Sequence, residues 1–202
     1  MKRILFATTN KNKVKRLLNF LGSSEFEFIT LDDLDYSIPE PEETKVTPVE
    51  IAMEKAEYYF DKLQKKMPVI SQDDTIVIKV KGVEEEILSI KKPVEEKYGE
   101  FNDDNAIKYY TELAEGNGGE IEMKSRYGFS YADQADVVGE PAVLKGKLVS
   151  QPSNTLQPGY FLTAIFKVEM LSGEYKYMSE MDDSENAYAD RDLKRCVMKL
   201  IK

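Results

Sequence analysis

Histidine is absent from the 202-residue chain, and cysteine occurs once, as Cys196. Without imidazole or a second thiol, the chain cannot form a Ser/His/Asp triad, a Cys/His pair, an internal disulfide or a cysteine-built zinc site. Carboxylates, lysines and hydroxyls remain for any chemistry, so a bound metal would be a hard cation such as Mg²⁺ or Mn²⁺. A single thiol near a C-terminal amphipathic stretch is typical of a small core residue and favours a reducing compartment.

Long apolar runs are also absent. The longest run near the N-terminus, Ile4–Ala7, is far too short for the core of a signal peptide. No segment approaches the ~18 apolar residues that span a membrane. Hydrophobic side chains nevertheless make up 42% of the chain, which is enough for a buried core. The sequence therefore predicts a soluble, cytoplasmic protein with no membrane partner.

Basic side chains are scarce relative to acidic ones, and the net charge is −9. Such a charge argues against general nucleic-acid binding, which requires a basic face to neutralise phosphates. The first 24 residues are different, because they carry six basic side chains and no acidic one. This basic N-terminal segment is compatible with a small polyanion as ligand.

One helix start is well marked. Thr47 is a suitable N-cap, Pro48 takes the first helical position, and Glu50 can close a capping box three residues after the cap. The pattern predicts a helix that continues until Pro68 ends it. Its buried apolar stripe would consist of Ala52, Ala56, Tyr59, Phe60 and Leu63.

Other strand-like and helix-like patterns alternate along the chain. We expect the polar residues Gln72–Asp74 to interrupt an apolar run ahead of a strand. The predicted strands are 3–8, 25–30, 75–80, 121–131, 144–149 and 160–168. The further predicted helices are 14–21, ended by Gly22, then 102–114, capped by Asn102, and about 184–201. This alternation predicts a single α/β domain over residues 1–202 with a mixed sheet.

The segment Ala7–Lys13, with the sequence ATTNKNK, lies between the first predicted strand and the first predicted helix. The free N–H groups and the dipole of a helix N-terminus form a natural anion site at the carboxyl end of a strand. Thr8, Asn10 and Lys13 would supply side-chain donors there. The glycines and the Gly-Lys-Ser/Thr ending of a Walker A loop are absent. The alternative is a solvated loop whose side chains satisfy turn and cap hydrogen bonds.

Two acidic motifs complement this loop. PEPEET (39–44) places three glutamates in a loop, and QDDT places Asp73 and Asp74 at the expected strand break. Adjacent carboxylates repel each other, and a divalent cation beside them would offset the repulsion. The alternative is a solvent-facing acidic turn. Lys55, near the edge of the apolar stripe of its helix, would on local grounds only extend its ammonium to solvent.

Five segments together resemble the inosine triphosphate pyrophosphatase-like family: FATTNKNKVKRL, EETKVTPVEIAMEKA, PVISQDDT and, more weakly, GYFLTAIF and MSEMDDSENAYADRDLKR. In order and spacing, the resemblance spans essentially the whole chain. It implies an elongated α/β fold with a long mixed sheet and two lobes that flank a nucleotide cleft. It also implies a homodimer and Mg²⁺-dependent hydrolysis of a nucleoside triphosphate to a monophosphate and pyrophosphate.

The resemblance also implies roles for individual residues. Asp74 would orient or deprotonate the attacking water, with Lys13 and Lys55 at the phosphates. The implied metal ligands are Glu43, Asp73 and Asp74. The implied substrate-binding residues are Thr8, Thr9, Asn10, Lys13 and Lys55 in the first half of the chain, and Gly159, Phe161, Thr163, Asn186 and Arg191 in the second half.

The second half departs from the family pattern where the family binds the base. Leu162, Thr163 and Ala164 replace an aromatic residue, an aspartate and a proline, and Asp190 replaces a histidine. The better-preserved phosphate half favours an active pyrophosphatase with an altered base preference over a nucleotide-binding protein with weak or no turnover. An interaction protein that binds no nucleotide is a third alternative, since the acidic surface and tyrosine-rich segments could serve a partner.

Overall fold

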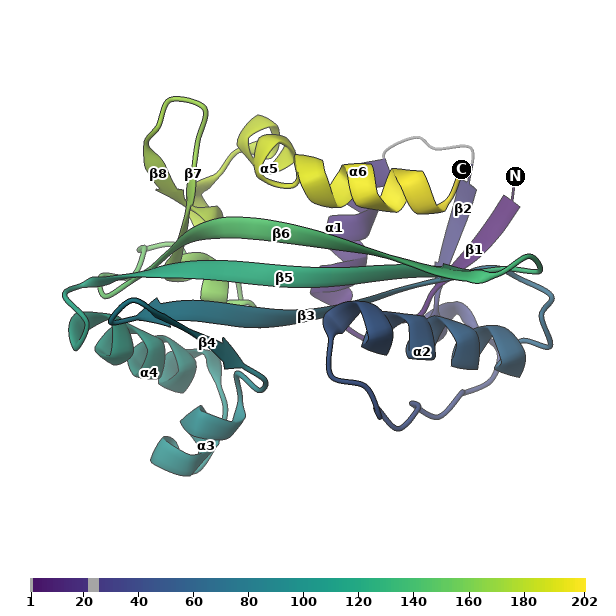
Figure 1. Ribbon diagram of the computed structural model, residues 1–202, viewed down its shortest axis with the longest axis horizontal. Coiled ribbons are helices and arrows are strands. Elements are labelled where there is room, and N and C mark those ends of the chain that lie inside the picture. Colours follow the sequence, from purple (N-terminus) through teal and green to yellow (C-terminus); the bar gives the residue numbers. More distant parts are fainter. Residues whose placement is uncertain (1, 22–25) are drawn as a thin grey trace. The chain divides into compact units, whose positions relative to one another are not determined.

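The computed structural model describes residues 2–21 and 26–202 and contains helices and strands that alternate along the chain (Figure 1). The strands are β1 (Lys2–Phe6), β2 (Phe26–Thr30), β3 (Val69–Val80), β4 (Val83–Ile87), β5 (Glu120–Ala132), β6 (Val137–Val149), β7 (Phe166–Glu169) and β8 (Tyr175–Tyr177). The α-helices are α1 (Lys11–Leu21), α2 (Pro48–Lys62), α3 (Lys92–Tyr98), α4 (Asp103–Glu115), α5 (Asp183–Ala189) and α6 (Arg191–Leu200). Short 3-10 helices are η1 (Leu31–Asp33), η2 (Phe161–Ala164) and η3 (Met178–Glu180).

The strands form one mixed sheet. Their order is β2-β1-β3-β5-β6-β7-β8, and β4 pairs with β3 beside this path. Strand β1 pairs in parallel with β2 and β3, whereas the pairs β3–β4, β6–β7 and β7–β8 are antiparallel. The predicted α/β fold with a mixed sheet is confirmed. Among the described residues, no helix is long and apolar enough to cross a membrane.

The chain forms two compact units. Unit 1 comprises Met1–Asp74, Tyr127–Ala142 and Asp192–Lys202, and unit 2 comprises Thr75–Arg126 and Val143–Arg191. Strands β3, β5 and β6 each contribute residues to both units. The prediction of a single domain over residues 1–202, with two lobes flanking a cleft, stays a prediction.

Helix α2 supplies much of the core of unit 1, and it begins as predicted. The Thr47 hydroxyl accepts a hydrogen bond from Glu50 N at 3.3 Å, and the Glu50 carboxylate accepts one from Thr47 N, which closes the capping box. The helix ends at Lys62, before Pro68, because Gln64 and Lys65 adopt positive φ angles of 55° and 59° that a right-handed helix cannot contain. The core cluster consists of Leu5, Ala7, Ile29, Ala56, Tyr59, Phe60, Leu63, Val69 and Ala132.

Helices α1 and α2 cover opposite faces of the sheet in unit 1. Successive residues of a strand point to opposite faces. The Tyr127 hydroxyl of β5 accepts a hydrogen bond from Arg16 of α1 at 2.9 Å, whereas a side chain on the next residue, Gly128, would point at Pro48 of α2. Side chains on one face of the sheet therefore contact α1, and side chains on the other face contact α2. The same applies to β3, whose adjacent residues Asp73 and Asp74 pair with different helices.

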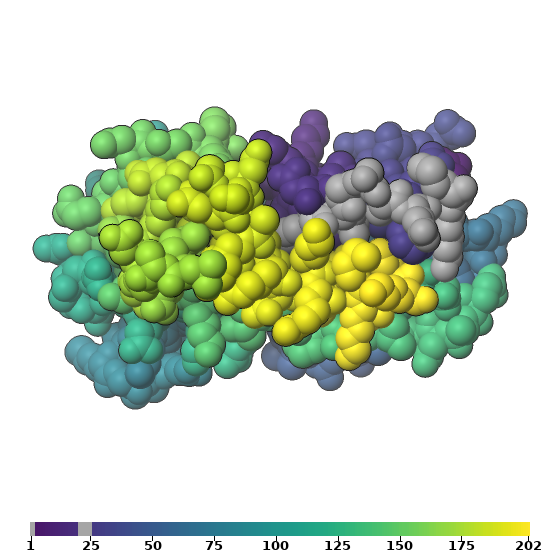
Figure 2. All heavy atoms as spheres, turned by 90° about the horizontal axis from the view of Figure 1, so that it is seen from above, coloured from purple at the N-terminus to yellow at the C-terminus, as the bar shows by residue number. Residues whose placement is uncertain are grey.

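Helix α6 lies along the beginning of β6 in unit 1. Lys199 pairs with Glu140, and the Cys196 thiol donates to the Pro141 carbonyl at 3.7 Å. Figure 2 shows the C-terminal residues in yellow on the surface beside the green residues of this strand. Burial and the nearby Glu140 carboxylate raise the pKa of Cys196 to about 11, so the thiol is a neutral core group, as the sequence predicts.

The close approach of α2 to β5 leads to a prediction about stability. We expect Gly128→Ala to lower the free energy of unfolding by about 1–3 kcal/mol, since overpacking forces backbone shifts. The added methyl would overlap the backbone of Pro48 and Val49. The control is Gly116→Ala, where φ is −63° and the nearest atom to the new methyl would lie 3.5 Å away. Urea unfolding of both variants measures the difference, and equal stabilities would contradict the close approach.

Unit 2 is organised around α4 and η2. The Asn102 side chain caps α4, as predicted, by accepting from Asn105 N at 2.8 Å. Tyr110 of α4 stacks on Phe161 of η2 with ring centroids 5.7 Å apart. This aromatic contact fixes η2, which carries two of the residues predicted to bind substrate.

Several predicted elements differ from the structure. Gln72–Asp74 do not interrupt a strand, because β3 runs through them without a break. The predicted strand 160–168 is wrong in its first half, which forms η2 before β7 begins at Phe166. The predicted helix 184–201 is two helices, because the chain turns at Asp190 between α5 and α6. Strands β4 and β8 and helix α3 are not predicted, and Gly22 and Glu25 lie outside the described residues.

Candidate functional site

A small cavity in unit 1 lies beside the end of β1 and the first turn of α1. Its volume is about 120 Å³. Sites that enclose a whole small molecule have volumes of ~300–1,000 Å³, so this cavity has room for only part of a nucleotide. It is lined by Ala7, Thr8, Thr9, Lys13, Leu31, Glu40, Pro41, Glu43, Lys55, Tyr59 and Gln72. The structure therefore brings together most of the residues predicted to lie at the phosphates.

The loop before α1 makes the turn and cap contacts that the alternative interpretation of ATTNKNK predicts. Asn10 Oδ1 accepts from the backbone N–H groups of Asn12 at 2.9 Å and Lys13 at 3.3 Å. Thr8 Oγ1 accepts from Asn10 N at 3.1 Å. These contacts start the helix and place Lys13 in its first turn, beside the cavity. Donation of hydrogen bonds from Thr8 and Asn10 to a phosphate stays a prediction.

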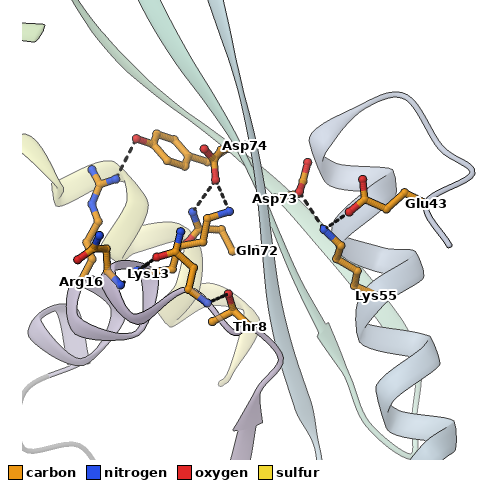
Figure 3. A network of polar contacts seen from close by, with 11 residues as sticks. Thr8, Lys13, Arg16, Glu43, Lys55, Gln72, Asp73 and Asp74 are labelled. Carbon is orange, nitrogen blue, oxygen red and sulfur yellow. Dashed lines mark hydrogen bonds and ion pairs between the residues drawn. The ribbon is translucent and has the colours of Figure 1, made fainter. Parts of the chain in front are cut away.

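Asp73 and Asp74 point to opposite faces of β3 (Figure 3). Asp73 faces α2, where its Oδ1 lies 3.1 Å from Lys55 Nζ, and Asp74 faces α1, where it pairs with Lys13. Burial is the main cause that raises the pKa of Asp73, against the positive charges of Lys55 and Lys13, and the Asp74 charge contributes least. The prediction that Asp73 and Asp74 repel each other at a strand break is therefore wrong. The strand is continuous, and it places the two carboxylates on opposite faces.

Lys55 joins two carboxylates on the α2 side of β3. Its Nζ lies 2.5 Å from Glu43 Oε1 and 3.1 Å from Asp73 Oδ1. Burial opposes the charged ammonium, but the hydrogen bonds and charges of Glu43 and Asp73 outweigh it and raise the pKa of Lys55. The Lys55 ammonium is thus held within the site and does not simply extend to solvent.

A second polar group lies on the α1 side of β3. Asp74 Oδ1 accepts from the Lys13 ammonium and from Gln72 Nε2, the latter at 3.3 Å. Both Gln72 and Lys13 line the cavity. Asp74 is more exposed than its neighbours, with 36% of its side chain accessible. A water molecule can therefore reach its carboxylate.

Glu43 and Asp73 form the part of the site that suits a hard cation, because both are oxygen donors and both reach the Lys55 ammonium. Within residues 2–21 and 26–202, no group of three or more acidic, histidine or cysteine side chains is arranged to hold a metal ion. Mg²⁺ usually takes one or two carboxylates together with substrate phosphates. The pair fits that donor set, and participation of Asp74 as a third ligand stays a prediction.

The predicted substrate-binding residues of the second half belong to unit 2. Phe161 is only 4% exposed and packs between Phe101 and Tyr110. Thr163 Oγ1 donates to Tyr160 O at 2.9 Å. The other three residues also make contacts within their own unit: Gly159 N donates to Asp103 Oδ2, the Asn186 amide donates to Met181 O and Asp182 O, and Arg191 donates to Tyr188 O. Contact of these five residues with a base stays a prediction.

Three polar residues that line the cavity, Gln72, Glu40 and Tyr59, were not predicted as site residues from the sequence. Gln72 lies in the stretch interpreted as a strand break, although its place two residues before Asp74 on one strand puts both side chains on one face. Glu40 accepts from Thr9 Oγ1 at 3.3 Å and so ties the acidic loop to the loop before α1. Tyr59 belongs to the apolar stripe of α2, and burial together with the Glu40 charge raises its pKa.

The fold is similar to two solved structures. A HAM1 protein from Coxiella burnetii superposes with a TM-score of 0.72 at 19% identity, over 100% of this chain and 98% of that one. The Staphylococcus aureus Ham1 protein gives a TM-score of 0.67 at 20% identity, over 98% and 99% of the two chains. At these identities the similarity concerns the fold.

Curated relatives match a shorter part of the chain. A dITP/XTP pyrophosphatase from Oceanobacillus iheyensis is 41% identical over 78 residues, which is 39% of this chain and 39% of the relative. A dITP/XTP pyrophosphatase from Haemophilus influenzae is 41% identical over 76 residues, or 38% and 37% of the two chains. The Ham1 family model matches residues 4–193, which confirms the relationship indicated by the sequence motifs. Because this match covers nearly the whole sequence, the chain belongs to the Ham1 family.

Proposed function

We propose that this chain is a metal-dependent nucleoside triphosphate pyrophosphatase, which hydrolyses a nucleoside triphosphate to a monophosphate and pyrophosphate. The proposal rests on one observation: the cavity is lined by two lysines, Lys13 and Lys55, and each is paired with a carboxylate of β3. Names of the relatives from Oceanobacillus iheyensis and Haemophilus influenzae support the same reaction.

The lysines would bind the phosphate chain. Lys13 extends from the positive end of α1, and Lys55 approaches the cavity from α2 on the other face of the sheet. Two ammonium groups on different helices can hold phosphate oxygens at two separate points. The small cavity volume favours the phosphates as the part of the nucleotide bound here. Thr8, Thr9 and Asn10 belong to the same proposed binding loop.

Glu43 and Asp73 would hold the divalent cation, Mg²⁺ or Mn²⁺, together with phosphate oxygens. When bound, such a cation supplies charge neutralisation at those oxygens. Lys55 lies between the two carboxylates in the ligand-free protein, where its ammonium balances part of their negative charge. Its flexible stem would allow the ammonium to move toward a phosphate and would leave Glu43 and Asp73 available to hold the cation.

Asp74 would act as the general base. Lys13 and Gln72 hold its Oδ1, so Oδ2 is the oxygen directed to the proton of water. As Asp74 takes that proton, the water oxygen forms a bond to the α-phosphorus. The bond from this phosphorus to the bridging oxygen breaks, and pyrophosphate leaves with the electron pair. Lys13 and Lys55 stabilise the negative charge on the leaving pyrophosphate.

The reaction is tested by incubating the protein with a panel of nucleoside triphosphates, with Mg²⁺ and with a chelator. We expect a monophosphate and pyrophosphate in equal amounts with Mg²⁺, and no products with the chelator. Orthophosphate and a diphosphate would contradict attack at the α-phosphorus. A nucleotide-binding protein without turnover would give no product but would melt at a higher temperature with Mg²⁺ and nucleotide, whereas an unrelated interaction protein would show neither effect.

A further prediction concerns the base. We expect discrimination below about a hundredfold between inosine or xanthosine triphosphate and ATP or GTP, because an unpaired buried polar group costs only ~1–3 kcal/mol. By its resemblance to the family, the chain has Thr163 at the position of the family aspartate, and the Thr163 hydroxyl donates to the Tyr160 carbonyl just before η2. The ratio of kcat/KM values across the panel measures the preference. A larger ratio would show that other residues recognise the base.

The proposal includes two expectations that come from the family and from the composition: assembly as a homodimer and a cytoplasmic location. Sedimentation of the purified protein distinguishes a dimer from the 23.1 kDa monomer. If the protein sediments as a monomer and is fully active, the expected homodimer would be wrong and the proposed reaction would be unaffected.

A further inference from the structure

We propose that Gln72 is a positioning residue that orients the Asp74 carboxylate for its role as general base. This inference rests on the proposed pyrophosphatase reaction. Gln72 is only 7% exposed, yet its polar side chain lines the cavity and its Nε2 lies 3.3 Å from Asp74 Oδ1. A buried amide is costly unless it is hydrogen-bonded, and here the hydrogen bond goes to the carboxylate that would take the proton.

The backbone fixes the relation between the two side chains. Gln72 and Asp74 are two residues apart on β3, so both point to the α1 face, whereas Ser71 and Asp73 point to α2. Strand β3 lies inside the sheet between β1 and β5. The position of the amide therefore depends on the sheet and not on a loop or on bound substrate (Figure 3).

Lys13 cannot give Asp74 the same fixed support. Its ammonium ends a flexible four-carbon stem, and in the proposed reaction it is drawn toward phosphate oxygens. When a triphosphate binds, the Lys13 ammonium would contact the phosphate oxygens, which carry more negative charge than the Asp74 carboxylate. Gln72 has no net charge and stays beside Asp74, because its place is set by burial and by the strand.

The chemistry of the amide determines which carboxylate oxygen is left for water. A carboxylate only accepts hydrogen bonds, so the amide must present its nitrogen to Asp74. Both Gln72 Nε2 and Lys13 Nζ contact Oδ1. Because Gln72 keeps its contact with Oδ1 when Lys13 moves toward a phosphate, the amide continues to orient the carboxylate and leaves Oδ2 for the proton of the attacking water.

Two variants remove this support in different ways. Gln72→Met keeps the length of the side chain but has no donor, and Gln72→Glu keeps the shape but places a second acceptor beside Asp74. We expect kcat to fall about tenfold or more in both, as for loss of a supporting hydrogen bond to a carboxylate in a site. KM and the affinity for a slowly hydrolysed triphosphate analogue should change less than about twofold, since Gln72 is not proposed to bind the phosphates.

The matched control is Gln134→Met. The Gln134 amide also donates a hydrogen bond in unit 1, to the Lys65 carbonyl, but it does not line the cavity. Its kcat should equal that of the wild type. Melting temperatures of all variants identify loss of folding, and affinity for the analogue measures the integrity of the site independently of turnover.

A double-mutant cycle with Asp74→Asn separates positioning from a general structural role. If Gln72 acts through Asp74, Gln72→Met should not lower the residual turnover of Asp74→Asn any further. An additional tenfold loss in that background, or a raised KM with unchanged kcat, would overturn the inference. If the wild type is active and Gln72→Met turns over at the same rate, the role of Gln72 would also be overturned, but the proposed function would stand. Absence of turnover in the wild type would instead contradict the proposed function itself.

Discussion

Replacing Asp74 with asparagine is expected to lower kcat by about 100-fold or more, because the amide cannot take a proton from water. The substitution keeps the volume of the side chain. It also keeps an oxygen that can accept from Gln72, so the local hydrogen bond is conserved. Single-turnover hydrolysis of a nucleoside triphosphate with Mg²⁺ measures the loss. Affinity for a slowly hydrolysed analogue should remain, since the phosphate-binding lysines are unchanged.

The control for this experiment is Asp61→Asn. Asp61, in the last turn of α2, also pairs with a lysine, Lys65 just beyond the helix, at 3.4 Å, but both side chains are exposed. Surface pairs of this kind contribute about 0–1 kcal/mol, so neither stability nor turnover should change measurably. Near-normal turnover of Asp74→Asn would exclude Asp74 as the base. Asp73, whose side chain is 18% exposed and whose pKa is raised mainly by its partial burial, would then be the remaining carboxylate of the pair.

Features that depend on a few neighbouring residues could be predicted from the sequence. The start of α2 follows from Thr47, Pro48 and Glu50, whose capping contacts form within one helical turn. The Asn102 cap of α4 is local in the same way. The position of Lys13 after β1 also follows from the order of strand, loop and helix, so its place in the first turn of α1 could be anticipated.

Features that depend on distant parts of the chain could not be predicted. Three polar residues in succession, Gln72–Asp74, normally indicate the end of a strand. They remain in β3, which lies between β1 and β5 in the sheet. Helices on both faces supply partners for their side chains: Lys13 from α1 and Lys55 from α2. Strand β4 is missed for a similar reason. Its sequence is mostly exposed and acidic, and it is a strand only because it pairs with β3.

Because Lys13 pairs with Asp74, removal of the lysine could in principle affect the stability of the ligand-free protein as well as phosphate binding. In the ligand-free protein, Lys13 is 24% exposed and Asp74 36%, so water partly screens the pair and its contribution to stability is small, about 0–1 kcal/mol. The cap of α1 uses the backbone N–H of Lys13, which an alanine would retain. The helix should therefore form normally without the ammonium.

Lys13→Ala is expected to weaken binding of a slowly hydrolysed nucleoside triphosphate analogue by about 1.5–3 kcal/mol, the value of a charge-assisted contact. Calorimetric titration in the presence of Mg²⁺ measures this change, and melting of the ligand-free protein should be nearly unaltered. Lys15→Ala is the matched control, because Lys15 is an exposed residue of the same helix that does not line the cavity. If the loop served only turn and cap contacts, both variants would bind the analogue equally well. A lower melting temperature for Lys13→Ala with unchanged affinity would therefore contradict phosphate binding at this lysine.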